Sequence, residues 1–170
     1  MTRGARMLIA VLALVGALVA VYLTLFKVGV IGELVCNIGS CERVNTSRWA
    51  VFLGVPVAAW GLATYLVLLV LALMSVQREG LERRIAWMLV VLSGWSVLFS
   101  AWLTSKELFV IHAICIWCVT SATIMTLILL ASLVELWRVR RAQRAESFDT
   151  QSAVPARASG SGSMRGSARG

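Results

Sequence analysis

Residues 112–137 read HAICIWCVTSATIMTLILLASLVELW, in which two cysteines stand at the start of a long apolar run. If this run is a helix, Cys115 and Cys118 lie within one turn and share one face, so their sulfurs can close a disulfide with little backbone motion. A helix start also offers unpaired N–H groups and the positive end of the backbone dipole, and both favour a thiolate. The stretch therefore indicates a redox-active pair of thiols.

Apolar residues dominate the whole chain. Of its 170 residues, 59% are hydrophobic and 14% are charged, with a mean hydropathy of +0.86. These values lie outside the range of soluble domains and predict a membrane protein. The net charge of +8 comes mostly from arginines beside apolar runs or in the terminal tail, so membrane orientation explains it better than nucleic-acid binding.

Four apolar runs are each long enough to cross a bilayer, which takes about 20 residues. They cover residues 7–28, 50–76, 85–104 and 109–137. The first run begins like a signal peptide, but it exceeds the roughly 7–15 apolar residues of such a core, and we expect it to be retained. The sequence thus predicts an all-α membrane protein, a four-transmembrane-helix bundle over residues 1–141, with a cysteine-containing external loop between the first two helices.

Residues 142–170 differ sharply from the rest of the chain. They are rich in Ala, Ser, Gly and Arg and nearly free of large apolar side chains. Such a composition cannot bury a core, and we expect a disordered cytoplasmic tail.

The positive charges indicate how the bundle is oriented. Four spans place both termini on one side, where the short segments carry nine Lys and Arg residues: Arg3, Arg6, Arg78, Arg83, Arg84, Arg138, Arg140, Arg141 and Arg144. The other side carries four, namely Lys27, Arg43, Arg48 and Lys106. By the positive-inside rule the termini are cytoplasmic. All four cysteines (Cys36, Cys41, Cys115 and Cys118) then lie at or near the external face, where disulfides form and persist.

Four cysteines at one face admit three interpretations. The first is a zinc site, but Cys36-x4-Cys41 is a loose partner for Cys115-x2-Cys118, and one pair is embedded in the membrane, so we predict no metal. The second is two static disulfides, although each would close a very small loop and constrain the unfolded chain little. The third is catalytic exchange between a dithiol in a polar loop and a dithiol at the mouth of the bundle, which we favour.

Three segments together resemble the vitamin K epoxide reductase family, in particular its bacterial members without a fused thioredoxin domain. They are Cys36-Asn-Ile-Gly-Ser-Cys41-Glu-Arg-Val-Asn-Thr-Ser47, then Gly54-Val-Pro56-Val-Ala-Ala-Trp-Gly61, and finally Cys115-Ile-Trp-Cys118. The resemblance spans residues 7–137. The order of the cysteine pairs and the serine six positions after Cys41 are more specific than the Cys-x-x-Cys motif alone.

The resemblance implies a role for each cysteine. Cys36 would exchange with a separate secreted or periplasmic thioredoxin-fold thiol oxidase, and Cys41 would exchange with Cys115. Cys118 would face a quinone of the ubiquinone or menaquinone type, which accepts the electrons. The implied location is the bacterial cytoplasmic membrane, and the implied outcome is disulfide formation in exported proteins.

Two other functions stay open. Members that reduce vitamin K epoxide carry a tyrosine four positions after the last cysteine and an asparagine on the second helix. This chain has Ala122 at the first place and no asparagine in residues 50–76. Vitamin K epoxide or quinone reduction in a secretory membrane is therefore the enzymatic alternative, and a structural membrane protein with static disulfides is the non-enzymatic one.

Three further residues are candidates for contact with the quinone. Ser47 matches the family serine and could bond in the pocket, or it could cap a short loop helix. Trp117 could stack on the ring, although tryptophans in membrane proteins more often anchor the interface. His112 could tune the Cys115 thiol or relay a proton, or it could simply be an interfacial polar residue.

Overall fold

A computed structural model of the protein describes residues 3–36, 40–77 and 82–160. Within these residues, four helices are long and apolar enough to cross a membrane: α1 (Arg3–Lys27), α3 (Val57–Gln77), α4 (Glu82–Lys106) and α5 (Ile116–Gly160). Shorter elements join them: α2 (Cys41–Thr46), the 3₁₀ turn η1 (Arg48–Ala50), strands β1 (Val51–Phe52) and β2 (Val55–Pro56), and the π-helical turn η2 (Glu107–Ile111). The predicted all-α four-helix membrane bundle is confirmed.

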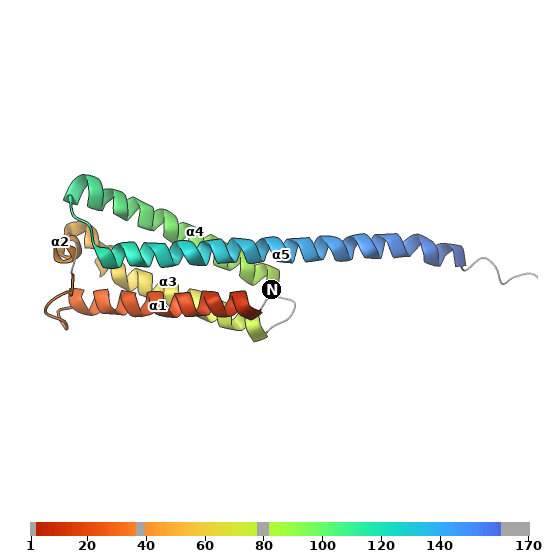
Figure 1. The fold of residues 1–170 in the computed structure, drawn as a ribbon, viewed down its shortest axis with the longest axis horizontal. Helices are drawn as coiled ribbons and strands as arrows, with labels where there is room; N and C mark the ends of the chain where they lie inside the picture. The colour runs from red at the N-terminus through yellow and green to blue at the C-terminus, as the bar shows by residue number, and fades with distance from the viewer. Residues whose placement is uncertain (1–2, 37–39, 78–81, 161–170) are drawn as a thin grey trace, which may run out of the picture.

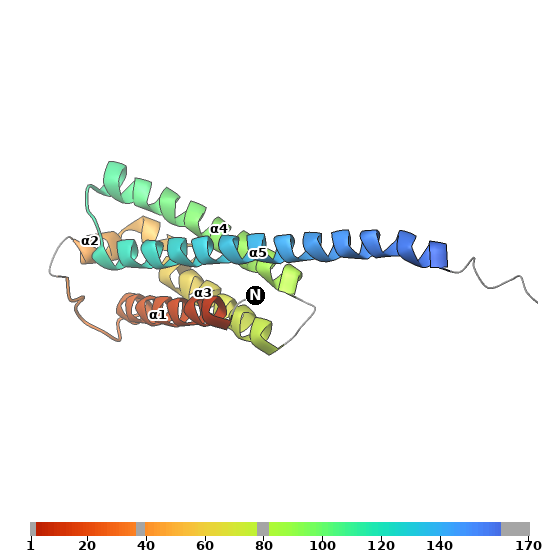
Figure 2. The ribbon, with the colours of Figure 1, turned by 45° about the vertical axis from the view of Figure 1, so that its right-hand side comes forward.

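The four long helices run side by side (Figure 1, Figure 2). α1 packs against α3 and α5, and α4 packs against α5 and α3. Small side chains such as Ala13 and Ala17 let α1 approach its neighbours closely, and Leu68, Leu89 and Ile128 fill the centre. The outer faces carry exposed leucines and valines, as a surface in contact with lipid requires: Leu14, Leu18, Leu66, Val70, Leu98, Leu130 and Leu133.

Tyr65 ties three helices together in the middle of the bundle. Its ring on α3 is fully buried and lies against Gly16 of α1, where a Cβ atom would collide with it. Its hydroxyl is 2.8 Å from the backbone carbonyl of Ser121 and 3.0 Å from the Ser121 hydroxyl on α5. Gly16 therefore provides the space that lets Tyr65 reach across to α5.

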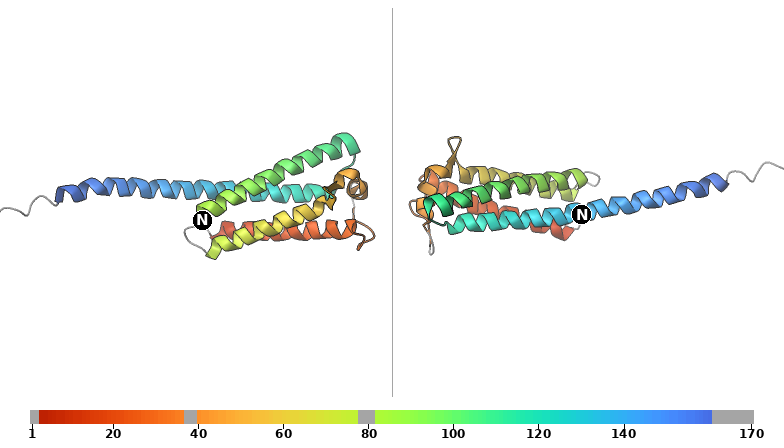
Figure 3. Two further views of the ribbon diagram at one scale, coloured as in Figure 1. Left: turned by 180° about the vertical axis from the view of Figure 1, so that it is seen from behind. Right: turned by 90° about the horizontal axis from the view of Figure 1, so that it is seen from above.

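The segment between α1 and α3 folds over one end of the bundle. α2 lies at that end, close to η2 and to the start of α5, while the beginning of α1 lies at the opposite end (Figure 1, Figure 3). Cys36 and Cys41 thereby reach the same end as Cys115 and Cys118. The arrangement brings together residues about 80 positions apart in the sequence, consistent with the four-span topology.

Helix starts differ from the sequence prediction at two spans. α3 begins at Val57 instead of residue 50, because β1 and β2 form a small antiparallel hairpin before it. Leu53 and Gly54, with φ of 54° and 79°, make the tight turn of this hairpin. α5 begins at Ile116 instead of residue 109, because His112 adopts a left-handed φ of 54° that ends η2 and redirects the chain.

Two helix ends differ as well. α4 continues to Lys106 and passes directly into η2, so the third run is longer than the predicted 85–104. α5 extends to Gly160, past both the predicted end at 137 and the predicted start of disorder at 142. The alanines and arginines there are good helix formers, and an established helix adds residues without a new nucleation cost. Residues 161–170 of the expected tail lie outside the described residues.

Candidate functional site

The two cysteine pairs differ in bonding. Cys36 and Cys41 form a disulfide with their Cα atoms 6.3 Å apart, whereas Cys115 and Cys118 are free thiols. One pair is therefore oxidised while the other is reduced.

Cys41 and Cys115 are buried in one small cluster. Cys41 opens α2 and is 1% exposed, and Cys115 precedes α5 and is 0% exposed. Val44 and Ala113 complete the buried part of the cluster, and the Ser40 N–H donates to the Ile114 carbonyl at 3.1 Å. The backbone contact sets the register between the two segments and holds the inner cysteine of each pair in a shared, water-poor environment.

Asn45 connects the two inner cysteines. Its side-chain amide donates to the Cys41 carbonyl at 3.0 Å and lies 3.7 Å from the Cys115 sulfur. Lys27 at the end of α1 donates to the Asn45 backbone carbonyl at 2.6 Å, which fastens α2 to the bundle. Asn45 was not predicted from the sequence. It stands four residues after Cys41, and this spacing places the two residues on one helix face only if the segment is known to be a helix.

The start of α5 favours a thiolate at Cys115. A hydrogen bond from the Cys118 thiol, assisted by the backbone N–H groups of Cys118 and Trp117, lowers the pKa of Cys115 to about 7. Burial and the nearby Glu107 carboxylate act in the opposite direction but do not outweigh it. The expectation that a helix start stabilises the thiolate therefore agrees with the geometry at this cysteine.

Glu107 is a buried acid beside the reduced pair. It belongs to η2, is 6% exposed, and its Oε2 accepts the Cys115 N–H at 3.4 Å. Its side chain is also a hydrogen-bond partner of the Cys118 thiol. The sequence analysis placed this residue in a short external turn. The signal that could have identified Glu107 is an ionisable residue at the edge of an apolar run. Placing a charge in a membrane span costs free energy, so such residues usually have a function.

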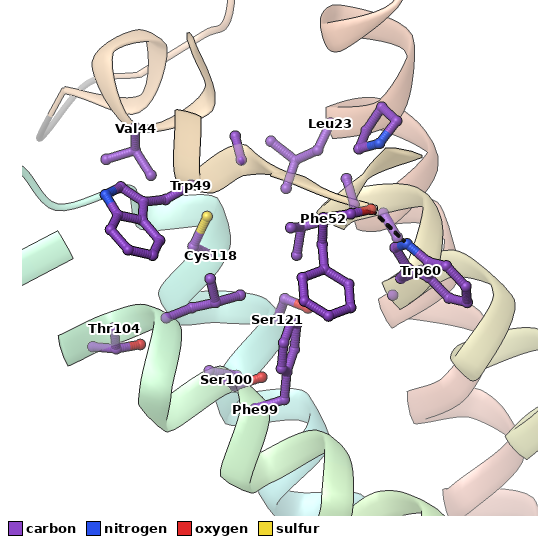
Figure 4. Close-up of a pocket in the computed structure, with 18 of the residues that line it drawn as sticks. Leu23, Val44, Trp49, Phe52, Trp60, Phe99, Ser100, Thr104, Cys118 and Ser121 are labelled. Atoms are coloured by element: carbon purple, nitrogen blue, oxygen red, sulfur yellow. Dashed lines mark hydrogen bonds between the residues drawn. The ribbon is translucent and has the colours of Figure 1, made fainter. Parts of the chain in front are cut away.

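A cavity of about 360 Å³ lies between the helices next to Cys118. Trp49, Phe52, Trp60 and Phe99 form much of its wall, and Figure 4 shows the Cys118 sulfur reaching it from α5. Trp60 on α3 and Trp95 on α4 also line the cavity and are 46% and 71% exposed, so the cavity is not fully enclosed. Its volume and its aromatic and aliphatic lining fit a quinone ring.

The sequence-predicted contact residues fare differently. Ser47 lines the cavity and its hydroxyl donates to the Val44 carbonyl at 2.7 Å, without a side-chain cap on η1, and its contact with the quinone stays a prediction. His112 is exposed and is not among the residues that line the cavity, and its predicted role as a cofactor contact stays a prediction. Its left-handed backbone ends η2 three residues before Cys115.

Trp117 is likewise not among the residues that line the cavity, and its contact with the quinone stays a prediction. Although it stands between the two thiols in sequence, its ring packs on Tyr22 at 5.1 Å, and its Nε1–H donates to the Val35 carbonyl at 3.0 Å. Successive helix positions point about 100° apart, so Cys118 faces the cavity while Trp117 faces the loop. Its observed place is a support for the segment that leads to Cys36.

No group of three or more His, Cys, Asp or Glu side chains is placed to hold a metal ion in the described part of the chain. The arrangement is instead that of a multi-pass membrane thiol–disulfide oxidoreductase, with two cysteine pairs at one end of a helical bundle. Residues 7–133 match the model of the vitamin K epoxide reductase family, and the chain belongs to this family. Members of the family are membrane oxidoreductases that work with quinones and thioredoxin-like partners.

Proposed function

We propose that the protein oxidises the dithiol of a separate, exported thioredoxin-fold partner and passes the electrons to a membrane quinone, so that exported proteins acquire disulfides. One observation carries the proposal most directly. Cys41 and Cys115 are buried in the same cluster, Cys36 is the more accessible member of its pair, and Cys118 borders the cavity. The four sulfurs thus make a route from the outer loop to the bundle interior.

Electrons enter by thiol–disulfide exchange at the loop. A thiolate of the partner attacks Cys36, breaks the Cys36–Cys41 bond, and is released when the partner closes its own disulfide. In the oxidised form of the helix pair, the Cys41 thiolate then attacks Cys115 and releases Cys118. Attack of Cys36 on Cys41 frees Cys115 and restores the loop disulfide. The structure has the bonding expected at this stage, with the loop pair oxidised and the helix pair reduced.

The helix pair then delivers two electrons and two protons as it closes the Cys115–Cys118 disulfide. A bound quinone supplies the two-electron acceptor for this step. Cys118 presents its sulfur to the cavity, and the start of α5 favours the Cys115 thiolate. Closing the Cys115–Cys118 bond would release both thiol protons and pass two electrons to the quinone, which would take up two protons and become the hydroquinone. Glu107 touches the Cys118 thiol and lines the same cavity, so we assign its carboxylate the role of receiving the thiol proton.

Vitamin K epoxide reduction is the weaker alternative. Ala122 lines the cavity, so the position that bears a tyrosine in epoxide-reducing members is correctly placed but offers no hydroxyl here. We expect Ala122→Tyr to strengthen binding of a naphthoquinone, and purified protein with a dithiol to reduce quinone in preference to epoxide. Efficient epoxide reduction by the unmodified protein would reverse this order.

We place the protein in the bacterial cytoplasmic membrane with cytoplasmic termini. The support is the excess of Lys and Arg in the segments at the end of the bundle opposite the cysteines. Cysteine accessibility to a membrane-impermeant maleimide in intact cells would test the orientation, with the loop pair labelled after reduction from outside.

Thiol trapping tests the electron route. Reduced protein is mixed with a water-soluble quinone analogue, quenched with a maleimide, and its disulfides are mapped by mass spectrometry. We expect quinone-dependent oxidation in the unmodified protein and its loss in Cys118→Ala. Retention of quinone-dependent oxidation in Cys118→Ala would exclude the assigned route. Protein whose thiols never respond to quinone would favour the static structural alternative.

A further inference from the structure

Serine and threonine hydroxyls in the spanning helices follow a common pattern. Nine of them donate to the backbone carbonyl four residues earlier, which satisfies the hydroxyl inside its own helix: Thr24, Thr64, Ser93, Ser96, Ser105, Thr120, Thr123, Thr126 and Ser132. Ser75 bonds one residue closer, to Ala72, and Ser121 pairs with Tyr65. Among the described residues of these spans, Ser100 and Thr104 on α4 have no such hydrogen bond.

Ser100 and Thr104 share one face of α4, because they stand four residues apart. Both line the cavity, and Figure 4 shows them on α4, across the cavity from Cys118 on α5. The neighbouring Ser105 faces away, is exposed, and bonds to the Ala101 carbonyl at 2.8 Å. The two hydroxyls of these spans without an acceptor among the described residues, Ser100 and Thr104, therefore both lie on the side of α4 that borders the cavity.

Several other polar side chains of the cavity already have partners. Ser47, Thr64 and Ser96 donate to backbone carbonyls, and Lys27 donates to Asn45. The Lys106 ammonium lies over the rings of Trp49 and Trp102, at 5.3 Å and 5.6 Å from their centres. Ser100 and Thr104, two neighbouring hydroxyls without a protein acceptor in the described part of the chain, stand in a wall that is otherwise largely apolar and can donate to a ligand that brings acceptors of its own.

We propose that Ser100 and Thr104 form the polar contact for the quinone ring, donating hydrogen bonds to a ring carbonyl oxygen. The inference rests on the proposed function, since a quinone carries carbonyl acceptors and no donors. Donors at this position also assist the reaction, because a hydrogen bond to the carbonyl strengthens as negative charge develops on that oxygen. α5 would then supply the electrons through Cys118, while α4 fixes the ring and determines which quinones bind.

Quinone binding to purified, detergent-solubilised protein tests the assignment. The probe is a short-chain ubiquinone analogue, titrated by quenching of tryptophan fluorescence, with Ser100→Ala, Thr104→Val and the double variant compared. We expect the double variant to bind about tenfold more weakly, the effect of losing one or two ordinary hydrogen bonds. Ser105→Ala is the matched control on the same helix and should bind as the unmodified protein does.

A second measurement separates a direct contact from a change of shape. With the analogue labelled at its carbonyl carbons, infrared difference spectra should show a carbonyl stretch that moves to higher frequency when the hydroxyls are removed. Thr104→Ser keeps the donor and should retain the original frequency. Unchanged affinity and frequency in the double variant would overturn the inference while leaving the proposed function intact. Absence of quinone binding to the unmodified protein would overturn both.

Discussion

The two cysteine pairs of this protein are both close in sequence but occupy different settings. Cys36 and Cys41 straddle the entry to a six-residue helix outside the spans, whereas Cys115 and Cys118 occupy the start of the long helix α5. In each pair one sulfur is buried in the shared cluster, and the other faces a different environment: Cys36 the loop, and Cys118 the cavity. The difference shows that close spacing is enough to make a dithiol, whereas burial determines which reaction partner each sulfur can contact.

Removing one buried sulfur should have the largest effect on this division of roles. We expect Cys41→Ala to stop turnover, because the loop can no longer form its disulfide or transfer electrons to Cys115. The free Cys36 thiolate should instead attack a thioredoxin-fold protein supplied in its disulfide form and give a mixed disulfide, which non-reducing electrophoresis would detect. Cys118→Ala is the comparison, since it should leave the exchange at the loop intact. Continued turnover without Cys41 would show that the partner reaches Cys115 directly.

Glu107→Gln should slow the reaction of the helix pair with quinone and leave the reaction of the loop pair with its partner unchanged. Loss of the proton acceptor beside Cys118 should slow quinone-dependent oxidation of the helix pair by about 10²-fold, the usual contribution of a positioned acid or base. Exchange between a dithiol partner and the loop pair should be unaffected. Single-turnover kinetics for each half-reaction would measure both, and equal slowing of the two would contradict the assignment.

pH should affect the helix pair through Cys115. Its pKa is lowered to about 7, so the thiolate fraction rises as the pH increases through 7. We expect oxidation of the helix pair by a soluble quinone to rise about tenfold per pH unit below 7 and to level off above it. Cys118→Ala removes the hydrogen bond that lowers the pKa, so the ultraviolet thiolate signal of Cys115 should appear at higher pH. If the pH midpoint of this thiolate signal is the same in Cys118→Ala, the Cys118 hydrogen bond does not lower the pKa of Cys115.

Asn45→Ala should weaken the connection between the pairs more modestly. The variant loses the bond to the Cys41 carbonyl and the contact with the Cys115 sulfur, so we expect exchange between the pairs to slow about tenfold, as one hydrogen bond to a charged group allows. Thr46→Ala is a suitable control, because Thr46 lies on the same short helix, is exposed and bonds only within it. Equal rates in the two variants would mean that packing alone aligns Cys41 with Cys115.

Apolar run lengths and charge were sufficient to predict the number of spans, because crossing a bilayer demands about 20 apolar residues whatever the neighbours are. Helix limits were less predictable. The hairpin before α3 depends on positive φ at Leu53 and Gly54, and the start of α5 depends on a left-handed His112, an uncommon conformation for a residue other than glycine. A hydropathy profile carries no information about these backbone conformations.

The sequence by itself determined the four-helix membrane fold, the two cysteine pairs and, through the order of its motifs, the family. Only the tertiary structure decided which side chains surround the sulfurs: Trp117 and His112 turned away, while Glu107 and Asn45 came in. The physical reason is that span length and hydropathy are properties of a segment alone. The surroundings of a sulfur depend on how helices distant in sequence rotate and pack against one another.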